Sequence, residues 1–236
     1  MKVVSLIPSY KPKKEKLFPV VEELKKFSQE IIIFAAENIE IEGCTVVLYD
    51  KSIVDNLVFE PRKWIVNNIE KDWDYVLYNE DDILIKEASF YNAVNIQNSI
   101  SYPYVSGFLR FELYDGKKWW IDQHPDHGVH TQNIGKQFII KNEDFWVPAN
   151  FHSGNYLFSK ENAKRIINDG WFETYFNEKN LRYCGPAETG ASGHYRKITK
   201  IIPIDFEMVE CEHLDNKYYH HSNTPSTEDL KKILTS

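Results

Sequence analysis

The fold of this chain is decided by residues 74–85, which read DYVLYNEDDILI. The apolar run 75–78 leads into three consecutive carboxylates, Glu80, Asp81 and Asp82, and apolar residues resume immediately afterwards. Adjacent acids repel one another unless something compensates their charge. Hard divalent cations with oxygen ligands, such as Mg²⁺ or Mn²⁺, commonly do so and bridge the phosphates of a substrate. The alternative is a solvated turn between two strands, where an isolated cluster of charges is usually found.

The segments around this stretch alternate between β-branched runs and helical patterns, which predicts an α/β domain with a Rossmann-like sheet. Strands are expected at residues 2–7, 31–36, 45–49, 74–79, 104–113, 137–140, 145–147, 155–158, 200–204 and 207–211. Helices are expected at residues 17–25 with Pro19 in the first turn, from 61, at 88–97, at 159–168 with Ser159 as the cap, from 188 and from 224. The acids therefore follow a strand at its carboxyl end, which is where ligands bind in open α/β sheets.

The composition narrows the class of protein. The net charge is −7, with acids and bases interspersed, which argues against a nucleic-acid binder that works by a basic surface. Three cysteines, Cys44, Cys184 and Cys211, fit a reducing compartment better than a disulfide framework, and small buried side chains are their expected role. No segment approaches the length of a membrane span, and the apolar run 3–7 is too short for a signal peptide. We expect a soluble, cytoplasmic protein or a catalytic domain from a longer one.

An apolar strand, a short acidic cluster and an apolar continuation together resemble the DxD motif of GT-A glycosyltransferases. The resemblance covers most of the chain and is to small single-domain enzymes of the family 2-like kind, including those of large DNA viruses or bacteria. It implies a GT-A fold, an open twisted mixed sheet flanked by helices. It also implies one domain over residues 1–236, with a nucleotide-binding half at about 1–100 and an acceptor-binding half at about 101–236. Here Glu80 replaces the first Asp of the motif, which leaves Asp82 as the expected metal ligand, with help from Glu80 or Asp81.

The resemblance also implies roles in donor binding for residues near the ends of other strands. These are Pro8, Ser9, Tyr10, Glu37 or Asn38, and Arg62 for the nucleotide, and Ser153 and Gly154 for the donor sugar and diphosphate. In the loop 150–155, the lack of bulky side chains would let a ligand approach the backbone. Ordinary strand-to-loop turns and a surface position for Arg62 are the alternatives.

A carboxylate and a late histidine complete the expected site. Glu188 follows the rigid turn Gly185-Pro186 at a predicted helix start, where inverting GT-A enzymes place the general base. Its alternative role is a favourable charge at a helix N-terminus. GT-A enzymes often supply a late metal-binding histidine, and His213 is preferred to His220 because it directly follows a predicted strand.

Two further groups of polar residues have open roles. His124, His127 and His130 fit no zinc pattern and are expected to meet an acceptor or solvent. Arg110 and Glu112 alternate with apolar residues on one strand, which allows either a structural ion pair or a role in acceptor binding.

The expected function is therefore a metal-dependent glycosyltransferase. It would move a sugar from a nucleotide-diphosphate donor, expected to be a UDP-sugar, to a hydroxyl of a glycan or saccharide acceptor, with Mn²⁺ or Mg²⁺ on the diphosphate and inversion of configuration. A sugar nucleotidyltransferase is the alternative enzyme, but residues 7–14 lack the glycine that a triphosphate-binding loop needs. The alternative that is not an enzyme is a carbohydrate-binding module. It is suggested by aromatic residues beside polar ones, as in Lys118-Trp119-Trp120, because exposed rings next to hydrogen-bonding groups suit the faces of sugars.

Overall fold

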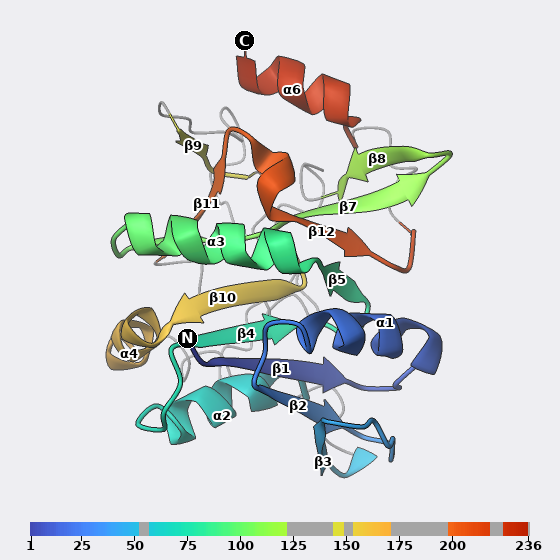
Figure 1. Ribbon diagram of the computed structural model, residues 1–236, viewed down its shortest axis with the longest axis vertical. Helices are drawn as coiled ribbons and strands as arrows, with labels where there is room; N and C mark the ends of the chain where they lie inside the picture. The colour runs from blue at the N-terminus through green and yellow to red at the C-terminus, as the bar shows by residue number, and fades with distance from the viewer. Residues whose placement is uncertain (52–56, 122–143, 149–152, 171–197, 218–223, 236) are drawn as a thin grey trace, which may run out of the picture. The chain divides into compact units, whose positions relative to one another are not determined.

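The computed structural model describes residues 1–51, 57–121, 144–148, 153–170, 198–217 and 224–235. The chain divides into two compact units, a first unit of Met1–Asp82 with Gly154–His194 and a second unit of Ile83–Ser153 with Tyr195–Ser236. Mixed sheets are flanked by helices (Figure 1), which confirms the expected α/β class.

The first unit contains a five-stranded sheet in the order β10-β4-β1-β2-β3. Its strands are β1 (Val3–Ser9), β2 (Glu30–Ala35), β3 (Thr45–Leu48), β4 (Tyr75–Asn79) and β10 (Asn155–Ser159), and its helices are α1 (Lys14–Leu24), α2 (Glu60–Asn67) and α4 (Lys160–Asn168). All neighbouring strands are parallel except β10, which runs antiparallel to β4. The parallel order 3-2-1-4 is that of a Rossmann-like sheet.

Burial explains why these residues form a central sheet. Every residue of β1 is buried, as expected for a parallel strand with both faces covered. Pro8 lies inside this strand, but it pairs with Phe34 of β2 at a point beyond the last pair with β4, Leu6 with Tyr78. A missing N–H is tolerated there because one side of the strand is no longer paired. The expected end of this strand at Ile7 was therefore too early.

The helix α1 buries the predicted stripe of Leu17, Val20, Val21 and Leu24. Pro19 lies inside the helix and not in its first turn, because α1 already begins at Lys14. In α4 the prediction is confirmed, since the Ser159 hydroxyl accepts a hydrogen bond from the backbone N–H of Asn162 at 3.2 Å.

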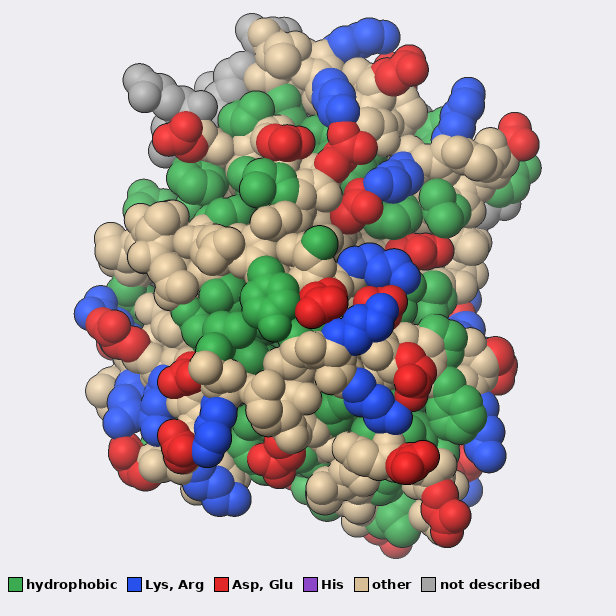
Figure 2. All heavy atoms as spheres, viewed as in Figure 1, with side chains coloured by type: hydrophobic (Ala, Val, Ile, Leu, Met, Phe, Trp, Pro, Cys, Tyr) green, Lys and Arg blue, Asp and Glu red, His purple; other side chains and the backbone are tan. Residues whose placement is uncertain are grey.

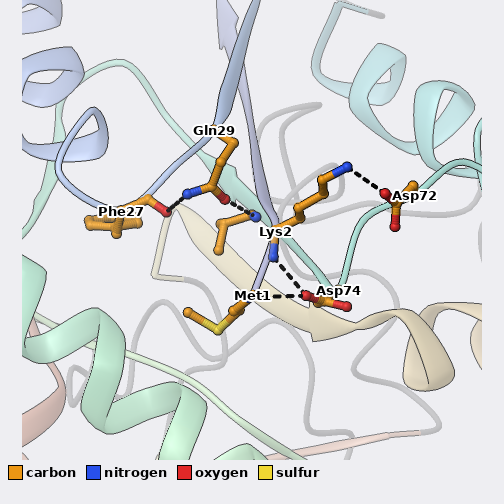
Figure 3. Close-up of polar contacts among 7 residues, drawn as sticks. Met1, Lys2, Phe27, Gln29, Asp72 and Asp74 are labelled. Carbon is orange, nitrogen blue, oxygen red and sulfur yellow. Dashed lines mark hydrogen bonds and ion pairs between the residues drawn. The ribbon is translucent and has the colours of Figure 1, made fainter.

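Polar contacts fasten the amino ends of these strands (Figure 3). The backbone N–H of Lys2 donates to Asp74 at 2.7 Å, and the Lys2 ammonium pairs with Asp72. The backbone N–H of Val3 donates to the Gln29 side chain at 2.7 Å. These contacts join the starts of β1, β2 and β4, so the acidic stretch lies at the opposite, carboxyl end of the sheet.

The second unit contains a four-stranded sheet in the order β5-β12-β7-β8 and a three-stranded sheet in the order β6-β11-β9. The strands are β5 (Ile83–Ile85), β6 (Tyr104–Ser106), β7 (Leu109–Tyr114), β8 (Lys117–Trp120), β9 (Phe145–Trp146), β11 (Thr199–Pro203) and β12 (Glu210–His213). The helices are α3 (Glu87–Ser99), α6 (Thr227–Thr235) and the short 3₁₀ helix η6 (Phe206–Val209). Trp120 packs edge-on against Phe206 in the core of this unit, with ring centroids 4.7 Å apart.

Three sequence predictions in the second unit were wrong in detail. The expected strand at 104–113 is two strands that join different sheets, and the break is at Gly107, where the buried Lys200 side chain passes so closely that a Cβ would lie 2.3 Å from Lys200 Cδ. The expected strand at 207–211 is η6 followed by β12, because Phe206 and Val209 are both buried at a spacing of one 3₁₀ turn. The last helix begins at Thr227 instead of residue 224.

Candidate metal and nucleotide site

The acidic stretch lies at the carboxyl edge of the first sheet. Glu80, Asp81 and Asp82 directly follow β4, as predicted. The neighbouring parallel strand β1 ends at Ser9, whose hydroxyl donates a hydrogen bond to Asp81 Oδ2 at 2.5 Å. The backbone N–H of Glu80 donates to the carbonyl oxygen of Gly154 at 2.8 Å. Four of the residues predicted to bind the donor, Ser9, Glu80, Asp81 and Gly154, therefore lie together at one edge.

Asp81 is half-buried at this edge, and its ionised form is disfavoured. Removal from water raises the pKa of the Asp81 carboxyl to about 6, and the charge of Asp82 acts in the same direction. The hydrogen bond from Ser9 and the charge of Lys16 oppose that rise only in part. A nearby cation would favour the ionised form, so the electrostatics of this edge suit a bound cation.

Asp82 belongs to a second group of side chains. It directly precedes β5, and Ile83 of β5 is paired with His213 of β12. The ligand atoms of Asp82, His213 and Asp215 all lie within 4.8 Å of one another, a spacing at which the three side chains could hold a metal ion. The structure thus brings together the two predicted metal ligands, Asp82 and His213. Asp215 was missed, although its place two residues after a strand-end histidine is a signal in the sequence.

Glu112 of β7 holds the imidazole of His213. Its Oε1 lies 2.6 Å from His213 Nδ1, and both side chains are buried. The same oxygen accepts a hydrogen bond from the backbone N–H of Lys217 at 3.0 Å. The chain returns to Glu112 through Asn216, which has a φ of +49°, a value that Asn adopts more readily than most residues. A carboxylate on one ring nitrogen fixes the orientation of a metal-binding histidine, and here it leaves Nε2 as the nitrogen for a ligand.

The chemistry of these donors fits a divalent cation. Two carboxylates and one imidazole form a mixed oxygen and nitrogen set, which suits Mn²⁺ better than Mg²⁺, because Mg²⁺ prefers oxygen ligands alone. Asp215 also forms an ion pair with the Lys217 ammonium. That positive charge partly compensates the carboxylates and would compete with a cation for Asp215.

Other predicted donor-binding residues have different surroundings. Tyr10 is 46% exposed, and Asn38 is exposed directly after β2. Arg62 is not at the surface, because α2 buries it in the core of the first unit. Its guanidinium lies 5.6 Å from the centre of the Phe59 ring, and its charge only partly opposes the effect of burial, which raises the pKa of Tyr156 well above its usual value. The nucleotide contact of Arg62 stays a prediction.

Ser153 is fully buried in the second unit. Its hydroxyl accepts a hydrogen bond from the ammonium of Lys200 at 3.0 Å, and the same ammonium donates to the carbonyl oxygen of Phe108 at 3.2 Å. The next residue, Gly154, has a φ of +67°, which a side chain would disfavour. The predicted roles of Glu188, His220, His124, His127 and His130 concern positions outside the described residues.

Comparison of the chain with protein-family models and with curated protein sequences gives no match. Among the described residues, no helix has both the length and the apolar character that a membrane crossing requires. Acidic and basic side chains are interspersed on the face that Figure 2 shows.

Proposed function

We propose that this protein is a metal-dependent glycosyltransferase of the GT-A type that uses a nucleotide-diphosphate sugar, expected to be a UDP-sugar. The observation that carries the proposal is the group of Asp82, His213 and Asp215, with the buried Glu112 behind the imidazole. A carboxylate directly after a central parallel strand, joined by a late histidine, supports a site for a cation and a diphosphate. The Rossmann-like order of the first sheet is compatible with nucleotide binding but is shared by many functions.

Each residue of the site has a defined task in this proposal. Asp82, His213 and Asp215 would hold Mn²⁺, which when bound offsets the negative charge that develops on the leaving diphosphate. Glu112 orients His213. Ser9 holds the Asp81 carboxylate at the carboxyl edge of the first sheet, and the lack of a side chain at Gly154 would let the donor approach the backbone. Glu188 would take the proton of the acceptor hydroxyl while its oxygen forms the new bond to the anomeric carbon, and the bond to the diphosphate oxygen breaks.

A thermal-shift titration with UDP and Mn²⁺ tests the nucleotide and metal parts of this proposal. We expect UDP to stabilise the protein only with Mn²⁺ or Mg²⁺ present, because the acidic edge repels a diphosphate without a cation. Asp82→Ala should abolish the shift. Asp74→Ala is the matched control, since this carboxylate flanks the same strand at its other end, and it should keep the shift.

Direct binding of Mn²⁺ identifies the metal ligands and does not require enzymatic activity. It is measured by the decrease in the EPR signal of unbound Mn²⁺. His213→Ala and Asp215→Asn should each weaken binding. Equal stabilisation by UDP in EDTA, or unchanged Mn²⁺ affinity in Asp82→Ala, His213→Ala and Asp215→Asn, would contradict the metal site. A panel of nucleotide sugars tested for metal-dependent hydrolysis then identifies the donor. Formation of pyrophosphate from a nucleoside triphosphate and a sugar phosphate would instead indicate a nucleotidyltransferase.

A further inference from the structure

A pocket of about 490 Å³ opens in the second unit between the β7–β8 turn and the start of α6. Residues 116–119 and 226–229 line it (Figure 1 shows both elements). The two walls are joined by hydrogen bonds. The backbone N–H of Trp120 donates to the carbonyl oxygen of Pro225, and the Trp120 indole donates to the Thr227 hydroxyl, both at 3.0 Å. Trp119 also pairs with Ser226 in an antiparallel bridge. The pocket is therefore part of the folded framework of this unit.

The lining combines an aromatic side chain with charged and hydroxyl groups. Trp119 is half-buried, and its indole N–H is shielded from water without a hydrogen-bond partner in the described part of the chain. The indole ring, and not its N–H, is therefore the part of Trp119 that a ligand can contact. Lys117, Glu228 and Asp229 line the same pocket. The Asp229 carboxylate also accepts a hydrogen bond from the Ser226 hydroxyl at 2.7 Å, which holds it in place.

These groups fit a saccharide better than a purely apolar or a purely ionic ligand. A sugar ring presents C–H groups that pack on an aromatic face and hydroxyl groups that both donate and accept hydrogen bonds. The Lys117 ammonium can donate to hydroxyl oxygens, and the carboxylates can accept from hydroxyl hydrogens. A charged ligand of either sign would meet a like charge in this pocket.

The register of the sheet places Trp119 beside the residues that support His213. Trp119 is directly opposite Glu112 in the β7–β8 pair, so both side chains project from the same face. Glu112 in turn contacts His213 of the next strand, β12. Because neighbouring strands are about 4.8 Å apart, Trp119 lies on the order of 10 Å from His213 across one sheet. Trp119 and the proposed metal ligand therefore lie on the same face of one sheet, with the buried Glu112 between them.

We propose that Trp119 and the pocket at residues 116–119 and 226–229 bind a pyranose ring of the acceptor glycan. The binding of a saccharide needs only this pocket, whereas its role as the acceptor rests on the proposed function. The ring packs against the indole, and Lys117 and Asp229 bind its hydroxyl groups.

Saturation-transfer NMR on the full chain tests this site with the methyl glycosides of glucose, galactose, mannose and rhamnose and with their disaccharides. At least one of these probes should bind. Trp119→Ala should weaken that binding by at least about tenfold, the change expected when one aromatic contact is lost. Tyr91→Ala removes another exposed aromatic ring of the same unit outside this pocket, and it should leave binding unchanged.

Lys117→Ala provides a second test, because this residue is exposed on an edge strand and its loss should leave the fold intact. It should also weaken the binding of the probe. The pocket assignment is overturned if no probe binds, or if Lys117→Ala and a folded Trp119→Ala both bind as the wild type does.

The UDP and Mn²⁺ thermal shift separates this result from that of the proposed function. Trp119→Ala should keep the full shift, because the substitution leaves the metal ligands in place. Saccharide binding that depends on Trp119, in a protein that shows no UDP shift, would support the pocket and contradict the transferase. A UDP shift without any saccharide binding would support the nucleotide and metal parts of the proposed function and contradict the pocket.

Discussion

Asp81→Asn replaces a half-buried carboxylate by a neutral side chain of the same shape. The amide oxygen can still accept the hydrogen bond from Ser9, so the substitution changes mainly the charge. Burial raises the pKa of Asp81 from 3.8 to about 6. A difference of about two pKa units corresponds to about 3 kcal/mol of unfavourable free energy for the ionised form in the folded protein. We expect Asp81→Asn to gain up to that amount of stability at neutral pH in EDTA.

The stability gained by Asp81→Asn should depend on pH. In the unfolded chain the carboxyl loses its proton near pH 3.8, whereas in the folded protein it keeps the proton up to about pH 6. Between these values the folded state binds more protons than the unfolded state, so the stability of the wild type falls as the pH rises. The gain of Asp81→Asn should therefore be small near pH 4, grow through this interval and stay constant above about pH 7.

Urea unfolding of both proteins in EDTA, at about pH 4 and about pH 8, measures this difference. Asp169→Asn serves as a control because this carboxylate is exposed at the end of α4, and its effect should be small at both pH values. Adding Mn²⁺ should reduce the gain, since a cation beside Asp82 would favour the ionised form of Asp81. A gain of equal size at both pH values, or a loss of stability at about pH 8, would refute the reasoning.

Other substitutions test the remaining parts of the molecule. Glu112→Gln should weaken Mn²⁺ binding by about tenfold to a hundredfold, measured by EPR, because His213 loses the carboxylate that orients it; unchanged affinity would contradict this orienting role. Gly107→Ala should destabilise the protein by about 1–3 kcal/mol in urea unfolding, because the new Cβ would overlap Lys200, and an unchanged midpoint would contradict that close packing. Glu188→Gln should keep the UDP and Mn²⁺ shift but cut sugar transfer at least roughly a hundredfold, whereas a full transfer rate would leave Glu188 only a helix-start role.

The first sheet could be predicted because its signals are local. Runs of β-branched residues, the stripe of α1 and the Ser159 cap each depend on residues close in sequence, and all have the expected structure. The position of the acids also follows from local sequence, since the carboxyl end of β4 is where the apolar run stops. Parallel pairing of β1 and β4 then brings Ser9 to Asp81.

The surroundings of His213 depend on strand pairings that no local pattern specifies. Glu112 reaches His213 because β7 lies parallel to β12, and these residues are 101 positions apart. The break at Gly107 depends in the same way on Lys200, which comes from β11. For Arg62 the alternative to a nucleotide contact was a surface position, because most arginines are exposed, but packing near Phe59 and Tyr156 places it in the core.

The buried contact between Glu112 and His213 is better explained by a functional role than by a contribution to the stability of the fold. Two apolar side chains of similar volume would fill the same space, and such replacements of buried polar pairs are often neutral or stabilising. Glu112 also accepts a hydrogen bond from the backbone N–H of Lys217, so it fixes both His213 and the turn that carries Asp215. Its cross-strand neighbour is Trp119, which lines the proposed saccharide pocket. One buried carboxylate thus positions two proposed metal ligands and stands directly beside the aromatic residue that we assign to the acceptor.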